Sequence, residues 1–217
     1  MCGIVGGVCK KNIAPFLIKG LKHLEYRGYD SAGLVVNIDN EFKRYRAEGK
    51  VSNLENKISE SDFNLTSKSG IAHTRWATHG VPSENNAHPH ICNNSIAVVQ
   101  NGIIENFQSL KEEQKKQDYI FTSDTDTEVI AHCIFESLKS SKSLLEATQK
   151  SINKFKGSFA IAVMSKDSPD EIVIAKKSAP MVIGLSDKGL FFASDKLALL
   201  ELTSTFIYLE DDDIAHI

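Results

Sequence analysis

The chain has little cysteine and no long apolar run. Its four cysteines include no CxxC pair, which argues against a zinc ribbon or a redox-active dithiol. No stretch approaches the roughly 20 apolar residues of a transmembrane helix, and the N-terminus lacks the charged and apolar regions of a secretory signal. These absences predict a cytoplasmic protein with reduced thiols. We expect Cys9, Cys92 and Cys133 to act as small, mostly buried hydrophobic residues.

An excess of charge is also missing. The 25 basic and 28 acidic residues give a formal net charge of -3. Because the sequence contains no basic stripe, a nucleic-acid partner is not expected. A length of 217 residues with 41% apolar composition is enough for one domain with a sizeable core. Because no repeat or linker interrupts the chain, we expect a single domain over residues 1–217.

Strand patterns lie at both ends of the sequence and helical patterns lie in the middle. Strands are expected at 3–8, 32–38, 42–47, 69–77, 95–102, 158–165, 171–177, 181–186, 190–194 and 205–210. Helices are expected at 15–26, 52–59, 106–117, 125–139 and 144–155. The remaining long segment, 78–94, is expected to be a functional loop. This order predicts an α+β fold in which helix layers enclose two sheets.

The segment MCGIVGGV places Cys2 directly after the initiator methionine. Removal of Met1 would give one residue both a thiol, with an ordinary pKa of about 8.5, and an α-amine, with an ordinary pKa of about 7.7–8.0. The amine could then accept the thiol proton and return it to a leaving group. The alternative is that Cys2 is an ordinary strand residue.

Two polar segments follow expected strands. In HTRWATHG, Arg75 could bind a carboxylate through two hydrogen bonds, or it could be a surface arginine beside a buried Trp76. In QNGIIENF, the Asn101 amide and the Gly102 backbone N–H could stabilise an oxyanion, or the Asn-Gly pair could be a tight turn.

Two further motifs have a simpler structural interpretation. In SDTDTE, we expect Ser123, Asp124 or Thr125 to cap the following helix, which leaves one carboxylate for a ligand ammonium group. In NAHPH, His88 and His90 lack the spacing and partners of a metal site. We therefore expect no metal, and a loop held by histidine hydrogen bonds.

Five motifs in this order resemble the glutaminase domains of the N-terminal-nucleophile, or class II, glutamine amidotransferases. They are CGIVGGV, LEYRGYDSAGL, GIAHTRWATHGVPSENNAHPH, VVQNGIIENF and SDTDTEVIAH. RGYDSAG and RWATHG favour the branch that forms amino sugars over the purine, asparagine and glutamate branches. The resemblance implies a four-layer αββα fold and hydrolysis of L-glutamine to glutamate and ammonia, without a cofactor. In that branch, C-terminal sugar-isomerase domains, which this chain lacks, use the ammonia to convert fructose 6-phosphate to glucosamine 6-phosphate in a homodimer.

The same resemblance implies a role for each catalytic residue. Cys2 is the nucleophile with its own α-amine as the base, and Asn101 and Gly102 form the oxyanion hole. Arg27 lies beside Cys2 and positions it. The chain departs from the family at Gln100, where a histidine is usual.

The substrate-binding residues are implied in the same way. Arg75, helped by Thr78 and His79, holds the α-carboxylate of glutamine. Asp126 holds the α-ammonium group, and Trp76 lies on a loop that closes over the substrate. The alternatives are a glutaminase domain of another class II amidotransferase and a non-catalytic glutamine-sensing module. Because the nucleophile, the oxyanion donors and both anchors are present, the sensing module is the less favoured one.

Overall fold

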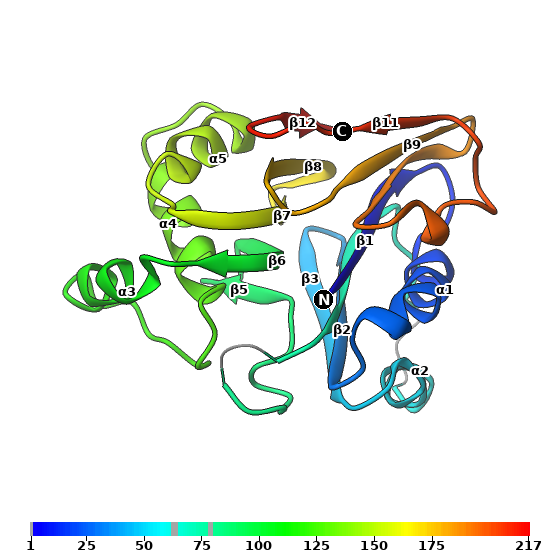
Figure 1. Ribbon diagram of the computed structural model, residues 1–217, viewed down its shortest axis with the longest axis horizontal. Helices are drawn as coiled ribbons and strands as arrows, with labels where there is room; N and C mark the ends of the chain where they lie inside the picture. Colours follow the sequence, from blue (N-terminus) through cyan, green and yellow to red (C-terminus); the bar gives the residue numbers. More distant parts are fainter. Residues whose placement is uncertain (1, 62–64, 78–79) are drawn as a thin grey trace.

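Two antiparallel sheets lie face to face in the computed structural model, which describes residues 2–61, 65–77 and 80–217 (Figure 1). The larger sheet has the order β11-β9-β10-β1-β4-β2-β3 and the smaller one β12-β8-β7-β6-β5. The larger sheet contains β1 (Gly3–Cys9), β2 (Ser31–Ile38), β3 (Glu41–Glu48), β4 (Ser69–Arg75), β9 (Val182–Ser186), β10 (Gly189–Ala193) and β11 (Phe206–Tyr208). The smaller sheet contains β5 (His90–Cys92), β6 (Ile96–Ile104), β7 (Gly157–Ser165), β8 (Ser168–Lys177) and β12 (Ile214–His216).

Helices cover the outer face of each sheet (Figure 1). The larger sheet is covered by α1 (Ala14–Leu24) and α2 (Val51–Ser59), and the smaller one by α4 (Glu128–Leu138) and α5 (Leu144–Ile152). A further helix, α3 (Phe107–Lys115), packs on α4. Two 3-10 turns, η1 (Glu25–Arg27) and η2 (Lys196–Ala198), complete the described elements. The four-layer αββα prediction is confirmed.

Alternating side chains within single strands build three hydrophobic layers. Leu34 in β2 packs under α1 and α2, whereas its neighbour Val35 points between the sheets. Val98 in β6 packs under α4, and Val99 points between the sheets. Successive side chains of a strand point to opposite faces, and here both faces are apolar because a helix layer covers each sheet.

The structure corrects the sequence-based prediction for segment 78–94. The expected loop at 78–94 contains strand β5, which pairs with the start of β6. The expected strand at 95–102 is confirmed as part of β6, and the alternative of a tight Asn-Gly turn is wrong, because Asn101 and Gly102 pair with β7. Gly102 has a φ of 103°, and a Cβ atom there would lie 2.0 Å from the Ser158 carbonyl oxygen. Glycine is required because the backbone of β7 occupies that space.

Among the described residues, no helix is long and apolar enough to cross a membrane. All four cysteines are free thiols, and Cys92 and Cys133 are buried.

Candidate active site

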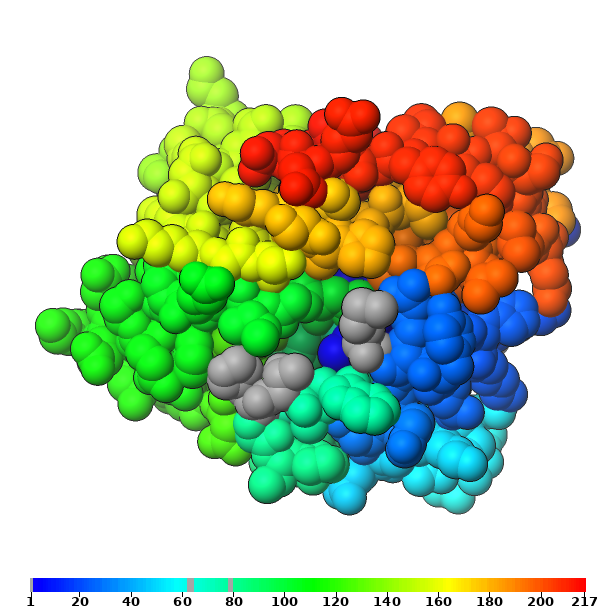
Figure 2. Space-filling view, in the orientation of Figure 1, coloured from blue at the N-terminus to red at the C-terminus, as the bar shows by residue number. Residues whose placement is uncertain are grey.

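The start of β1 meets the end of β4 and the end of β6 at one edge of the sandwich. Gly3 pairs with Thr74 in the larger sheet. From the smaller sheet, the Asn101 side-chain amide donates a 3.0 Å hydrogen bond to the Cys2 carbonyl oxygen. The beginning of the chain reaches the molecular surface here, as the blue atoms in Figure 2 show. Both sheets therefore contribute to the surroundings of Cys2.

The Cys2 thiol is half-buried and in contact with the backbone that follows β4. Its Sγ accepts a 3.3 Å hydrogen bond from the Trp76 backbone N–H. Burial raises the pKa of the Cys2 thiol, and the Trp76 hydrogen bond offsets this only in part. A thiol with a raised pKa is protonated at neutral pH, so nucleophilic attack by Cys2 needs a nearby base.

Asp30, which the sequence analysis did not single out, holds this backbone in place. Its carboxylate accepts hydrogen bonds from the Ala77 backbone N–H and, at 2.9 Å, from the Ser31 hydroxyl. Its own N–H donates to the Arg75 carbonyl at 3.2 Å. Asp30 lies in the RGYDSAG motif, which was the available signal in the sequence.

The two expected substrate anchors line the same cavity as Cys2. Arg75 is 4% exposed, and its guanidinium donates to the carbonyl oxygens of Gly80 and Val81 at 3.3 and 3.4 Å. Asp126 is 5% exposed, and its Oδ2 accepts from the Ile104 backbone N–H at 2.8 Å. The cavity therefore places a cation and an anion within reach of one thiol.

The expected helix cap in SDTDTE is wrong. Helix α4 begins at Glu128, and neither its N-cap residue Thr127 nor the three expected residues supply a side-chain cap. The Glu128 carboxylate instead reaches back to the preceding turn, where it accepts from the backbone N–H groups of Thr122 and Ser123 at 2.8–3.1 Å. This turn presents Asp126 to the cavity.

Arg27 belongs to a side-chain network and is not among the described residues that line the cavity at Cys2. Its guanidinium pairs with Asp195 at 2.5 Å, and both side chains are mostly buried. The next residue toward the N-terminus, Ser194, accepts a 3.0 Å hydrogen bond from the Ile4 backbone N–H in β1. The influence of Arg27 on Cys2 through this network stays a prediction.

Trp76 is not buried. It is 50% exposed and makes an edge contact with Tyr29, with ring centroids 5.8 Å apart. Thr78 and His79, the expected helpers of Arg75, lie outside the described residues.

The expected histidine hydrogen bonds of the loop are confirmed. His88 Nε2 is 3.1 Å from the Thr127 hydroxyl, and His90 Nε2 is 3.0 Å from the Thr125 hydroxyl. Within the described part of the chain, no group of three potential metal ligands lies together.

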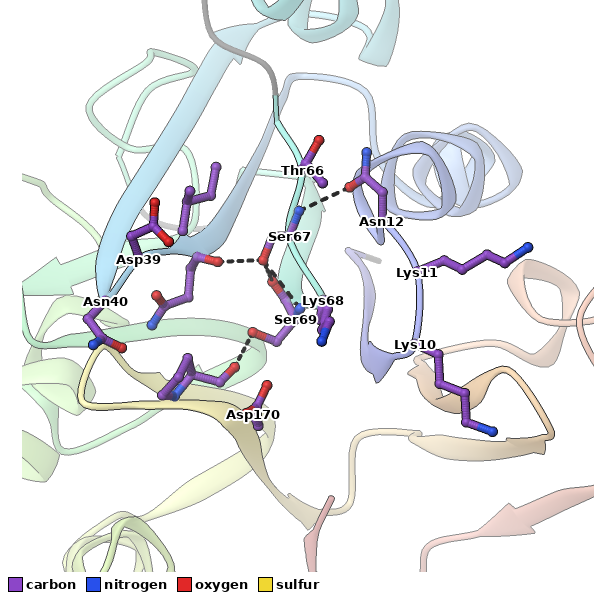
Figure 3. Close-up of a pocket in the computed structure, with 13 residues that line it drawn as sticks. Lys10, Lys11, Asn12, Asp39, Asn40, Thr66, Ser67, Lys68, Ser69 and Asp170 are labelled. Atoms are coloured by element: carbon purple, nitrogen blue, oxygen red, sulfur yellow. Dashed lines mark hydrogen bonds between the residues drawn. The ribbon is translucent and has the colours of Figure 1, made fainter.

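A second, much larger cavity of about 560 Å³ lies at the opposite ends of β1, β2 and β4 (Figure 3). Its central polar groups bond to one another: the Ser67 hydroxyl donates to the Asn37 and Ser69 carbonyls at 2.5 and 2.9 Å. The Asn12 amide oxygen accepts from the Ser67 N–H at 3.2 Å. Because these groups are bonded to one another and no cysteine is among the described residues that line this cavity, the smaller cavity at Cys2 is the candidate active site.

The four layers, and the Cys2 thiol in one cavity with the buried Arg75 and Asp126, match a class II glutamine amidotransferase of the N-terminal-nucleophile type. Residues 73–201 match the family model described as "Glutamine amidotransferase domain", and the chain belongs to this family.

The curated relatives include the glutamine–fructose-6-phosphate aminotransferases [isomerizing] of Pseudomonas putida and Haemophilus influenzae. They are 53% and 50% identical to this chain over its whole length. The chain spans 35% of the length of each. Among solved structures, glutamine phosphoribosylpyrophosphate amidotransferase from B. subtilis matches this chain over its whole length, with a TM-score of 0.83 and 26% identity. The match covers 47% of the B. subtilis chain. A class II domain protein from Silicibacter pomeroyi (TM-score 0.64, 13% identity) shares the fold.

Proposed function

We propose that this chain hydrolyses L-glutamine to glutamate and ammonia, with Cys2 as the nucleophile. The observation that carries the proposal is that the Cys2 thiol lies in one cavity with the side chains of Arg75 and Asp126. The Asn101 side-chain amide adjoins them, 3.0 Å from the Cys2 carbonyl oxygen. A binding module would need the anchors alone. The nucleophile and the oxyanion donor therefore favour catalysis.

These groups support the following reaction. Arg75 and Asp126 hold the α-carboxylate and α-ammonium of glutamine, with Thr78 and His79 assisting Arg75. The α-amine exposed by removal of Met1 takes the thiol proton, and the Cys2 thiolate attacks the side-chain amide carbon. The Asn101 amide and the Gly102 N–H stabilise the oxyanion. The amine returns the proton to departing ammonia, and water then hydrolyses the thioester to glutamate.

We further infer that the complete protein delivers this ammonia to a sugar-isomerase unit that converts fructose 6-phosphate to glucosamine 6-phosphate in a homodimer. Support comes from about 50% identity to enzymes named for that reaction, of which this chain spans 35%. The four free thiols fit a cytoplasmic location. Because no sugar-phosphate site is assigned to this chain, residues 1–217 alone should release glutamate at the same rate with and without fructose 6-phosphate. Marked stimulation of this chain alone would contradict the division of labour.

The glutaminase itself is tested by glutamate release from Cys2→Ala, combined with intact mass to report Met1 removal. We expect Cys2→Ala to abolish hydrolysis and to retain glutamine binding. The matched control is Cys9→Ala, at the other end of β1, where the thiol contacts only the Lys11 carbonyl among the hydrogen bonds described. Full activity in Cys2→Ala, or in a protein that retains Met1, would refute the mechanism.

A further inference from the structure

We infer that Gln100 is a positioning residue that orients the Asp126 carboxylate toward the substrate ammonium, and that His88 and Thr127 fix the orientation of the Gln100 amide. This inference deepens the proposed function and rests on it. It assigns a task to a buried residue that the sequence analysis left without one.

The four side chains form one buried network at the cavity. Gln100 is 2% exposed and Thr127 is fully buried. The Gln100 Nε2 lies 3.4 Å from Asp126 Oδ2, and its Oε1 lies 2.5 Å from the Thr127 hydroxyl. That hydroxyl is also 3.1 Å from His88 Nε2. The backbone N–H of Gln100 closes the circuit, because it donates to His88 Nδ1 at 3.3 Å.

The direction of every hydrogen bond in this circuit follows from one fixed donor. A backbone N–H can only donate, so His88 Nδ1 must accept. In a neutral imidazole the proton is then on Nε2, which donates to the Thr127 hydroxyl. The hydroxyl therefore gives its own proton to Gln100 Oε1, and the Gln100 NH₂ group faces Asp126.

The neutral state of His88 has an independent physical cause. Burial lowers the pKa of His88 well below its ordinary value, and the nearby His73 and Arg75 lower it further. The His73 ring stacks on the His88 ring, with centroids 4.1 Å apart. The circuit therefore keeps one direction throughout the neutral pH range.

The network fixes the orientation of the Asp126 carboxylate through its Oδ2 oxygen. Asp126 Oδ2 receives both the Ile104 N–H and the Gln100 amide, so rotation of the carboxylate would break both hydrogen bonds. Binding is stronger when the groups that contact a ligand are already held in the bound orientation. Gln100 thus acts on the α-ammonium through Asp126, without needing to touch the substrate.

The test measures calorimetric affinity in the complete protein carrying Cys2→Ala, so that no turnover is required. The ligands are L-glutamine and glutaramate, which is glutamine without its α-amino group. We expect Gln100→Met to weaken glutamine binding by about tenfold to a hundredfold, the scale of a hydrogen bond to a charged group. Glutaramate affinity should change much less, because this ligand has no ammonium group to place.

The matched control is Gln114→Met, the same change at a glutamine that is 5% exposed and donates to the Val129 carbonyl and the Cys133 thiol. It should leave both affinities unchanged. Equal weakening of both ligands by Gln100→Met would reveal a merely structural role and overturn the inference, as would unchanged glutamine affinity.

A second pair of variants decides the question if Gln100→Met does not fold. Thr127→Val removes the hydroxyl that orients the amide and should weaken glutamine selectively, whereas Thr127→Ser keeps the hydroxyl and should restore the affinity. Equal glutamine affinities in the two variants would overturn the inference. Absence of glutamate release by the protein with Cys2 intact would instead refute the proposed hydrolysis, and these affinities would still report on Gln100.

Discussion

At the residue scale, kinetics can show whether Asn101 stabilises the transition state, as we propose, or binds substrate. Its amide nitrogen donates one hydrogen to the Cys2 carbonyl at 3.0 Å and has a second hydrogen for the substrate oxygen. We expect Asn101→Ala to lower kcat for glutamine hydrolysis by about 100–1,000-fold, as loss of one oxyanion donor does in other enzymes. KM should change less, because the charge on the oxygen develops only in the transition state. A normal kcat with a raised KM would show that Asn101 binds substrate instead.

The anchors are expected to behave in the opposite way. A planar guanidinium can form two parallel hydrogen bonds with a carboxylate, which a lysine ammonium cannot reproduce. Arg75→Lys and Asp126→Asn should each raise KM for glutamine by about tenfold to a hundredfold, measured as initial rates of glutamate release. Unchanged KM in both variants would mean that the α-carboxylate and the α-ammonium bind elsewhere.

At the element scale, strand β6 joins Asn101 and Gly102, the proposed oxyanion donors, to the smaller sheet, and the glycine at 102 permits this. We expect Gly102→Ala to abolish activity and to lower the free energy of unfolding by more than the ~1–3 kcal/mol of a strained backbone. The reason is that a new Cβ would meet the Ser158 carbonyl at 2.0 Å.

Gly49→Ala is the control for Gly102→Ala. Gly49 also has a positive φ, of 85°, but its nearest neighbour is the Asn53 side-chain amide at 2.8 Å, which can move. Urea unfolding and glutamate release measure both effects. Equal losses of stability in the two variants would show that backbone strain alone, rather than the contact with β7, makes glycine necessary at 102.

The element scale also shows how far the sequence could predict this molecule. Periodicity identified the helices and most strands. In a segment such as 125–139, the face that packs on the rest of the protein is apolar, and this produces a regular spacing in the sequence. Periodicity did not settle whether Asn101 and Gly102 continue their strand or form a turn, since an Asn-Gly pair favours a turn locally and only pairing with β7 keeps it extended. It also missed Asp30 and Glu128, whose carboxylates hold backbone groups that no local pattern reveals. Tertiary hydrogen bonds decided each of these positions.

At the scale of the whole molecule, three buried histidines connect the two sheets beside the active site. His73 on β4 donates from Nε2 to the Gln100 carbonyl on β6 at 3.0 Å. His73 stacks on His88, and the rings of His88 and His90 are 4.9 Å apart. The active-site edge therefore depends on imidazoles that have to stay neutral for the sheets to remain packed.

This dependence predicts acid sensitivity. Burial lowers the pKa of His73 to about 3, and burial also lowers the pKa values of His88 and His90 well below 6.5. In the unfolded chain each histidine accepts a proton near pH 6.5, so between that pH and the folded pKa the unfolded state binds more protons and stability falls as pH falls. From pH ~7.5 to ~5.5, each histidine lowers the free energy of unfolding by about 1.4 kcal/mol, which makes about 4 kcal/mol for three.

Urea unfolding followed by circular dichroism at the two pH values measures this loss. His90→Gln should reduce this loss by about a third. Equal stability of the unmodified protein at both pH values would show that the three histidines take up protons without unfolding, and that their packing does not hold the sheets together.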